Sequence, residues 1–333
     1  MRVLVTGGAG YVGSHMVKML RRAGAEVVVF DNLSSGPRAA VTGSTFVPGD
    51  VTDRAAVAAL FERFRIDAVM HFAALIQVGE SVREPASYYR TNFVGTLNVL
   101  DAMRAAGVRH FIFSSSAAIF GEPKYTPIDE VHPAAPINPY GFSKLAVERA
   151  LADYDRAYGI RSVSLRYFNA AGADPEGELG ECHEPETHLI PLVLQAASGR
   201  RPSVTIYGTD YPTADGTCIR DYVHVNDLCQ AHLKALEFLM RGDRSAAYNL
   251  GNGLGFSVRQ IIDAAERVTG RPIAVEIGPR RAGDPAVLVA DSKRAIAELG
   301  WRPEYQELET ILRHAWAWEQ RRARNDKKGM HTA

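Results

Sequence analysis

The fold of this chain is decided by the stretch Val3-Leu4-Val5-Thr6-Gly7-Gly8-Ala9-Gly10-Tyr11-Val12-Gly13. Its first four residues form a short apolar run typical of a buried strand, and a helical pattern follows Gly13. Gly7 permits a tight turn, Gly10 allows the backbone to approach a pyrophosphate, and Gly13 allows the helix to pack on the strand. The G-x-x-G-x-x-G spacing therefore predicts a dinucleotide-binding turn, against the alternative of an ordinary glycine-rich turn.

A second apolar strand is expected at residues 26–30, and it leads directly into Asp31. A carboxylate at this position can accept hydrogen bonds from both hydroxyls of an adenosine ribose, and it would repel a phosphate on that ribose. The following residues up to Gly36 contain no arginine, and the first arginine is Arg38. The sequence therefore predicts NAD as the cofactor and not NADP.

Strand and helix patterns alternate through the first half of the chain. This alternation predicts an α/β fold with a doubly wound, parallel Rossmann sheet. A polar segment from Asp174 to Glu186 interrupts it, and we place the domain change there: residues 1–173 for the NAD-binding domain and 174–320 mainly for a smaller α/β substrate-binding domain. Some segments of the second part are expected to return to the Rossmann domain. Ser257 and Gln260 have the spacing of a capping box, and the charged residues 321–333 are expected to fray.

Composition narrows the class of protein further. The 333 residues include 38 acidic and 38 basic side chains, so the chain has no net charge that would favour nucleic acid or an anionic membrane. No apolar run approaches the length of about 20 residues that spans a bilayer, and no signal peptide is evident, so we expect a cytoplasmic enzyme. Cys182, Cys218 and Cys229 lack metal-ligand spacing, so we expect reduced thiols and no metal site.

A candidate proton-transfer group lies in Tyr140-Gly-Phe-Ser-Lys144. Asn138 is a suitable N-cap and Pro139 a suitable first helical residue, so Tyr140 and Lys144 should project from one face of a helix. A nearby cation favours the phenolate, so we expect the pKa of Tyr140 to be lowered. The five-residue pattern alone occurs on many helix surfaces, and its significance depends on the cofactor turn upstream.

Several longer motifs extend this reading: Asp50-Val51, His71 to Ala74, Asn92, Ser114 to Ser116, and the segments 165–173, 187–191, 207–213, 216–225 and 280–284. With the glycine turn, Asp31 and the Tyr140 to Lys144 segment, they resemble the extended short-chain dehydrogenase/reductase family, and within it the UDP-glucose 4-epimerases. The resemblance covers nearly the whole chain.

The resemblance implies three sets of site residues. The catalytic residues would be Ser116, Tyr140 and Lys144. The NAD-binding residues would be Gly7, Gly10, Tyr11, Val12, Gly13, Asp31, Asn32, Leu33, Ser34, Ser35, Gly36, Asp50, Val51, Phe72, Ala73, Ala74, Leu75, Asn92, Ser114, Tyr140, Lys144 and Phe168. The UDP-sugar would contact Ser116, Tyr140, Asn169, His188, Leu189, Tyr207, Arg220, Arg281, Asp284 and Leu288.

The reaction that the resemblance implies begins with Tyr140 taking the proton of the sugar 4-hydroxyl while hydride leaves C4 for NAD. Related dehydratases carry an acidic residue just after their serine or threonine, whereas this chain has Ala117 and Ala118. The 4-keto sugar would therefore turn over and take the hydride back on its other face, which interconverts UDP-galactose and UDP-glucose. A nucleotide-sugar oxidoreductase and a noncatalytic NAD-binding regulator remain the alternatives.

Three further expectations rest on the resemblance. His188 falls where relatives carry asparagine, and Ile76 where some carry lysine. Leu288 is smaller than the tyrosine of some relatives, which would admit some N-acetylated substrate, unless Leu288 is only a core contact. Relatives pair through the helices equivalent to residues 88–106 and 140–158, which implies a homodimer.

Overall fold

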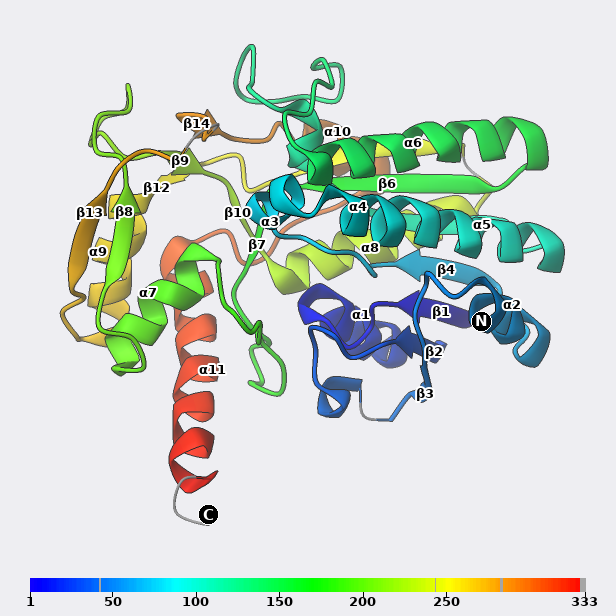
Figure 1. Ribbon diagram of the computed structural model, residues 1–333, viewed down its shortest axis with the longest axis horizontal. Coiled ribbons are helices and arrows are strands. Elements are labelled where there is room, and N and C mark those ends of the chain that lie inside the picture. The colour runs from blue at the N-terminus through cyan, green and yellow to red at the C-terminus, as the bar shows by residue number, and fades with distance from the viewer. Residues whose placement is uncertain (42, 243, 282–283, 330–333) are drawn as a thin grey trace.

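The central element of the structure is a seven-stranded parallel sheet in the order β11-β6-β5-β4-β1-β2-β3 (Figure 1). This computed structural model describes residues 1–41, 43–242, 244–281 and 284–329. The sheet order and the helices on both faces confirm the predicted doubly wound Rossmann fold. Its strands are β1 (Arg2–Thr6), β2 (Glu26–Asp31), β3 (Thr45–Pro48), β4 (Ala68–His71), β5 (His110–Ser116), β6 (Arg161–Tyr167) and β11 (Ala246–Leu250).

Two hydrophobic layers cover this sheet, and alternate residues of each strand enter opposite layers. In β1, Val3 and Val5 join the layer formed with α1 and α8, whereas Leu4 joins the layer formed with α2, α5 and α6. This alternation follows from the two-residue period of a strand. The covering helices are α1 (Tyr11–Arg22), α8 (Val225–Met240) and α10 (Lys293–Leu299), and on the other face α2 (Arg54–Arg63), α5 (Gly95–Ala106) and α6 (Pro139–Tyr158).

The second half of the chain forms a smaller lobe, which lies at the left of Figure 1. Its core joins three helices to a two-stranded parallel sheet. These elements are α7 (Leu189–Ser198), α9 (Val258–Thr269), α11 (Leu308–Gly329), β8 (Val204–Tyr207) and β13 (Val275–Gly278). Ser257 and Gln260 form the predicted capping box at the start of α9.

Short strands connect the two lobes. β7 (Asn169–Ala171) pairs with β10 (Tyr222–His224), and β9 (Ile219–Arg220) lies between β12 (Phe256–Ser257) and β14 (Val287–Leu288). The chain then returns to the Rossmann layers through α8, β11 and α10. A division at residue 173 therefore marks only the first departure of the chain from the Rossmann lobe.

Two elements differ from the sequence patterns. The expected helix at 88–106 consists of the end of α4 (Pro85–Tyr88), a π-helical turn η2 (Tyr89–Val94) and α5. Helix α11 continues to Gly329, so residues 321–329 of the segment expected to fray are helical, and residues 330–333 lie outside the described part. Arg322 at this end donates to the Glu181 carbonyl at 3.3 Å. None of the described helices is long and apolar enough to cross a membrane.

Candidate active site

The glycine turn between β1 and α1 is sterically fixed at two of its glycines. Gly7 has φ of 70°, and a Cβ on it would lie 2.4 Å from the Ala73 backbone nitrogen. A Cβ on Gly13 would lie 2.1 Å from the Gly7 carbonyl oxygen. Side chains at these positions are therefore excluded by the protein itself, as predicted for a tight turn and for close packing of helix on strand.

Gly10 is different, because the protein leaves room for a side chain there. A Cβ on Gly10 would meet only the Gly7 oxygen, at an ordinary contact distance of 3.4 Å, and its φ is −69°. Neither packing nor backbone conformation requires glycine at this N-cap of α1. A ligand that approaches the amides at the start of α1 does require it, so the turn fits a bound pyrophosphate.

Asp31 at the end of β2 holds the loop beside the glycine turn. Its Oδ2 accepts from the Ala9 amide at 2.9 Å and its Oδ1 from the Leu33 amide at 2.7 Å. Each carboxylate oxygen retains a lone pair for a ribose hydroxyl. Leu33 has φ of 60°, the only positive value among the described residues other than glycine. A positive φ at a leucine is unfavourable, so the loop that contains Leu33 keeps this conformation only because its surroundings hold it.

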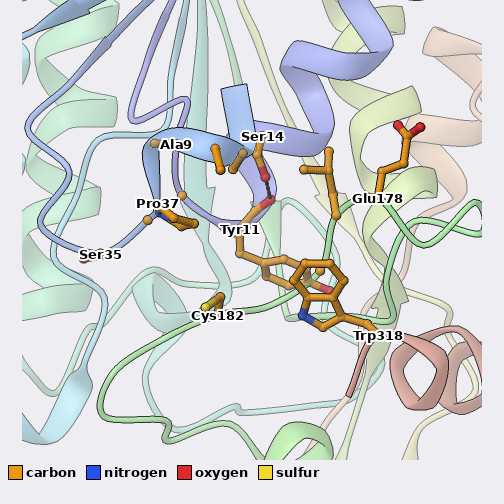
Figure 2. Close-up of a pocket in the computed structure, with 14 residues that line it drawn as sticks. Ala9, Tyr11, Ser14, Ser35, Pro37, Glu178, Cys182 and Trp318 are labelled. Carbon is orange, nitrogen blue, oxygen red and sulfur yellow. Dashed lines mark hydrogen bonds between the residues drawn. The ribbon is translucent and has the colours of Figure 1, made fainter. Parts of the chain in front are cut away.

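A cavity of about 110 Å³ adjoins this turn (Figure 2). Ala9, Tyr11 and Ser14 form one side, and Cys182 and Trp318 from the second half of the chain lie opposite. The Tyr11 hydroxyl donates to the Gly172 carbonyl at 2.7 Å, which joins the two sides. The dinucleotide turn is therefore in direct contact with the segment that follows β7.

The remaining predicted cofactor residues gather at the carboxyl ends of the parallel strands. Asn32 donates to Asp50 at 2.7 Å, which joins the loops after β2 and β3. The amide of Asn92, on the π-helical turn, bonds both backbone groups of Leu75 at 2.8 and 3.0 Å and donates to Ser143 at 3.1 Å. Asn92 therefore positions the loop after β4, where Ile76 is 39% exposed.

Ser116, Tyr140 and Lys144 meet where β5 ends and α6 begins. Asn138 caps α6 by accepting from the Gly141 amide at 2.8 Å, with Pro139 in the first turn, as predicted. The Ser116 Oγ atom accepts from the Ala118 amide at 3.1 Å, and the Ser116 side chain favours the charged form of Tyr140. Lys144 is 4% exposed, and its Nζ donates to the Ser114 carbonyl at 2.8 Å and lies 5.9 Å from the centre of the Tyr140 ring.

The expected lowering of the Tyr140 pKa is wrong for the chain without ligands. Burial raises the pKa of Tyr140, although the hydrogen bond from Ser116 partly offsets this. Burial also lowers the pKa of Lys144 to about 7. The reason is that removal from water disfavours the charged form of each group.

A buried polar network behind these residues was not foreseen from the sequence. Glu148 forms an ion pair with Arg166 at 2.6 Å and accepts from Ser115 at 2.6 Å. Tyr167 hydrogen-bonds to Ser114. This network fixes the end of β5 that carries Ser116. Its signal in the sequence is Glu148, which follows Lys144 by four residues on the same helix face.

One group of predicted substrate residues lines a second, smaller cavity of about 60 Å³. Leu189, Tyr207 and Arg281 are all part of its wall. The Arg281 guanidinium lies 4.0 Å from the centre of the Tyr207 ring, a cation–π contact. Residues 282–283 of the same motif lie outside the described residues.

Another group lies around β9. Arg220 donates to Asp284 at 3.1 Å and to the Pro285 carbonyl at 2.8 Å. Leu288 pairs in register with Arg220 and, like Phe168, packs against the cluster of Ala117, Ile119, Phe120 and Ile128. These residues do not line the cavity that contains Leu189.

Asn169 and His188 are partly engaged within the protein. Asn169 donates to the Asp221 carbonyl at 2.8 Å, which leaves its side-chain oxygen available. The Nδ1 atom of His188 lies 2.6 Å from a carboxylate oxygen of Glu181. Only the Nε2 side of this ring is therefore open to a ligand.

A dinucleotide turn, an acidic residue after β2 and a Ser, Tyr and Lys group at the end of β5 define an NAD-binding enzyme of the Rossmann class. The model of the NAD dependent epimerase/dehydratase family matches residues 3–251. The chain belongs to this family.

Within this family, several known proteins are similar to nearly the whole chain. A UDP-glucose 4-epimerase of Halalkalibacterium halodurans is 52% identical over 318 residues, which cover 96% of this chain and 95% of that protein. The crystal structure of UDP-glucose 4-epimerase from Brucella ovis in complex with NAD has a TM-score of 0.92 at 51% identity, over 95% of this chain and 97% of that one. The enzyme from Bifidobacterium longum in complex with NAD+ and UDP has a TM-score of 0.91 at 39% identity, over 96% and 98%.

Proposed function

We propose that this protein interconverts UDP-galactose and UDP-glucose by inverting the configuration at C4, with NAD retained in the site. The observation that carries the proposal is the group of Ser116, Tyr140 and Lys144 beside a dinucleotide turn, with Ser116 and Lys144 buried and with alanines at 117 and 118. Similarity to UDP-glucose 4-epimerases over nearly the whole chain supports the choice of substrate.

The residues that would hold NAD are the glycine turn for the pyrophosphate, Asp31 for the adenosine ribose and Lys144 for the nicotinamide ribose. When bound, NAD supplies a reversible hydride acceptor and a positive charge close to Tyr140. In this arrangement Lys144 would exchange the Ser114 carbonyl for a ribose hydroxyl.

Tyr140 is the proposed base that removes the proton of the sugar 4-hydroxyl, and Ser116 hydrogen-bonds at the same oxygen. Because burial raises its pKa in the free chain, Tyr140 needs positive charge in the filled site before it can act as a base at neutral pH. After the sugar has turned over, C4 would take the hydride back on its other face and Tyr140 would return the proton to the same oxygen, so the substrate is neither oxidised nor reduced overall.

Arg220 and Arg281 are the proposed anchors of the diphosphate. Guanidinium groups bind phosphate through paired donors, and these two arginines approach from β9 and from the wall shared with Tyr207. With the nucleotide held, the sugar can rotate about the diphosphate and present its other face. The alanines at 117 and 118 offer no acid or base for eliminating water from the 4-keto sugar.

The direct test is to incubate the purified protein with UDP-galactose and no added cofactor, and to separate the sugar nucleotides by chromatography. We expect conversion to UDP-glucose. Tyr140→Phe should lower kcat by about 10²–10⁴-fold while bound NAD, measured after denaturation, is unchanged. Turnover that requires stoichiometric NAD would favour the oxidoreductase instead, and full activity of Tyr140→Phe would refute the mechanism.

We propose that Leu288 also admits the N-acetylated pair of substrates as a minor activity. Leu288 is only partly buried and packs against the same apolar cluster as Phe168. A larger side chain would crowd the C2 substituent, so Leu288→Tyr should remove activity on UDP-N-acetylgalactosamine and preserve activity on UDP-galactose. Equal loss of both activities would indicate that Leu288 is only a packing residue.

We propose that the protein forms a homodimer through the outer surface of α5, η2 and α6. This surface exposes apolar side chains, including Val94 at 45%, Phe142 at 53% and Tyr158 at 46%. Light scattering on the eluting protein should give twice the chain mass, and Val94→Arg should give monomer. A monomeric wild type would overturn this proposal.

A further inference from the structure

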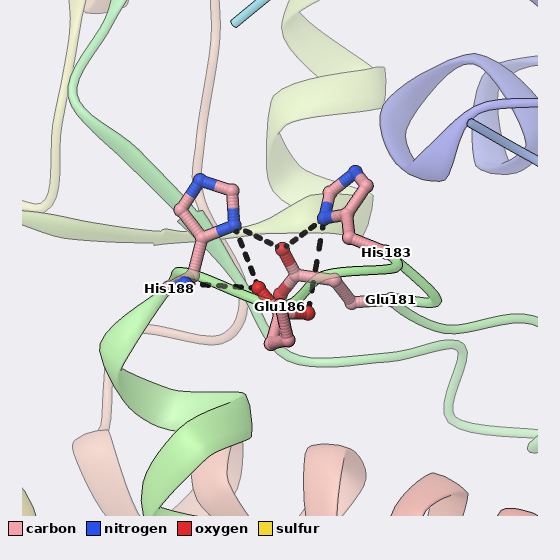
Figure 3. A group of neighbouring side chains, drawn as sticks. All are labelled: Glu181, His183, Glu186 and His188. Carbon is pink, nitrogen blue, oxygen red and sulfur yellow. Dashed lines mark hydrogen bonds and ion pairs between the residues drawn. The ribbon is translucent and has the colours of Figure 1, made fainter. Parts of the chain in front are cut away.

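Four potential metal ligands converge in the segment between β7 and α7, away from Ser116 and Tyr140 in the sequence. They are Glu181, His183, Glu186 and His188, and each offers one ligand atom, with all of these atoms within 4.8 Å of one another (Figure 3). Both imidazole rings direct Nδ1 toward the two carboxylates. This group contains no cysteine, so the cysteine spacing does not predict it. Its sequence pattern is Glu-x-His-x-x-Glu-x-His.

Three of the four nitrogen–oxygen separations in this group are within about 0.5 Å of the spacing around a tetrahedral ion, and the fourth is the distance of a hydrogen-bonded ion pair. The Glu181 Oε1 atom lies 3.1 Å from Nδ1 of His183 and 2.6 Å from Nδ1 of His188. The Glu186 oxygens lie 3.8 and 3.3 Å from the same two nitrogens. Zinc bonds of about 2.0–2.1 Å at tetrahedral angles place neighbouring ligand atoms about 3.3 Å apart.

One of these atoms, Oε2 of Glu186, is buried and has no hydrogen-bond donor among the described residues. The two Nδ1 atoms are paired with Glu181, at 3.1 and 2.6 Å, but without regular hydrogen-bond geometry. Glu186 uses its other oxygen to accept from the amides of Thr187 and His188, at 2.7 and 2.9 Å. Its side chain is 4% exposed, so Oε2 is held inside the group without a donor. Buried polar atoms of this kind normally have a partner, and a metal ion would supply one.

A second acidic group in the same segment provides an internal comparison. Asp174, Glu176 and Glu178 also lie close together, but Lys18 occupies their centre at 2.6, 2.9 and 2.8 Å. That group already contains its cation. The group at Glu181 instead contains two imidazoles, which are ordinary ligands of transition metals and poor ligands for Mg²⁺ or Ca²⁺.

We propose that Glu181, His183, Glu186 and His188 bind one Zn²⁺ ion as a closed structural site. Four protein ligands leave no open position, so the ion would have no part in the reaction. It would instead fix the segment between the two lobes. The Glu181 carbonyl accepts from Trp318 of α11 at 2.9 Å, the His183 ring lies 6.4 Å from that of Tyr11, and His188 is the N-cap of α7.

The test is the zinc content of the full-length protein, purified with its cofactor, saturated with Zn²⁺ and then passed into metal-free buffer. We expect about one Zn²⁺ per chain in the wild type and background levels in His183→Gln and Glu186→Gln. His110→Gln, a partly exposed histidine at the opposite end of β5 from Ser116, is the matched control and should retain the zinc.

Two further measurements keep the proposal testable if one variant does not fold. The Co²⁺-loaded wild type should show the intense visible absorption of a tetrahedral site. A chelator should lower the melting temperature of the wild type but not that of a folded ligand variant, because an ion that binds only the folded chain stabilises it. Zinc at background in the wild type, or equal zinc in the wild type and the His183→Gln/Glu186→Gln double variant, would overturn the proposal and leave the group as imidazoles paired with carboxylates.

Discussion

In the Rossmann lobe, alternate residues of each strand enter opposite hydrophobic layers, whereas the segments of the second half are held by buried aspartates that accept backbone amides. Asp221 is the clearest case: its carboxylate accepts from Asn252, Gly253 and Ala290 at 2.6, 3.0 and 3.0 Å. Asp227 similarly accepts from Glu304 and Tyr305 at 2.8 and 2.9 Å. The first arrangement follows from local periodicity, and the second joins residues that are far apart in the sequence.

The comparison teaches why the catalytic group lies where it does. Ser116 and the glycine turn stand at the ends of strands that are fixed by packing on both faces, so their positions are rigid. The residues proposed to hold the UDP-sugar lie on short strands and loops, where a few hydrogen bonds determine the local structure.

The largest effect is expected for Gly13→Ala in the Rossmann lobe. Its Cβ would lie 2.1 Å from the Gly7 oxygen, so helix α1 must move away from β1. We expect a loss of about 1–3 kcal/mol in the free energy of unfolding, together with loss of bound NAD. Gly10→Ala is the control: urea unfolding should be unchanged while NAD retention falls. Equal stability of Gly13→Ala and the wild type would contradict the packing argument.

The second prediction concerns catalytic activity and a glycine at the start of helix α6. A Cβ on Gly141 would lie 2.3 Å from the Ala118 carbonyl oxygen, which would move the first turn of α6 and the Tyr140 side chain. We expect Gly141→Ala to lower kcat by about 10²-fold, because small displacements of reacting groups are costly. Gly79→Ala is the matched control, since its Cβ would meet only Arg83, at 3.9 Å. Steady-state kinetics of both variants would decide, and an unaffected Gly141→Ala would show that the turn adapts.

Asp221→Asn tests the hydrogen bonds between buried aspartates and backbone amides in the second half of the chain. The amide cannot accept from all three backbone donors, so at least one buried N–H loses its partner. We expect a loss of about 1–3 kcal/mol in the free energy of unfolding, measured by urea titration. Asp153→Asn on exposed α6 should change it by less than about 0.5 kcal/mol. A similar small change in both variants would mean that packing also fixes the second half.

The smallest expected effect concerns acid stability. Burial lowers the pKa of His15 and His232 to about 4 and that of His71 to about 3. Between about pH 4 and 6.5 the unfolded chain therefore binds protons that the folded chain does not, so stability falls as the pH falls. Asp227, whose pKa burial raises to about 6, opposes this slope by one proton.

His232→Leu should flatten that dependence by about one proton, which is about 1.4 kcal/mol per pH unit. The Nε2 atom of His232 is buried without a partner among the described residues, and its Nδ1 atom bonds the Leu228 carbonyl one helical turn away, at 2.8 Å. The measurement is the urea midpoint as a function of pH for both proteins. An unchanged slope would mean that His232 does not contribute to acid sensitivity.

Much of this molecule could be predicted from residues that are close in the sequence. The strand, turn and helix at Gly7 to Gly13 and the start of α6 at Asn138 depend on local spacing, and the structure has them as predicted. The capping box at Ser257 is of the same kind. Local periodicity and capping are written in neighbouring residues, so they can be recognised without the fold.

Only the tertiary structure determined the pKa shifts and the contacts between residues that are far apart in the sequence. The burial that raises the pKa of Tyr140 depends on packing around α6, and this reversed the expected shift. The contact of Glu148 with Arg166 and the hydrogen bond from the Ala290 amide to Asp221 also required the folded chain. The sequence alone determined which chemical groups are present and the local elements that carry them. The fold determined which of these groups lose water and which meet, because both depend on residues brought together from distant parts of the chain.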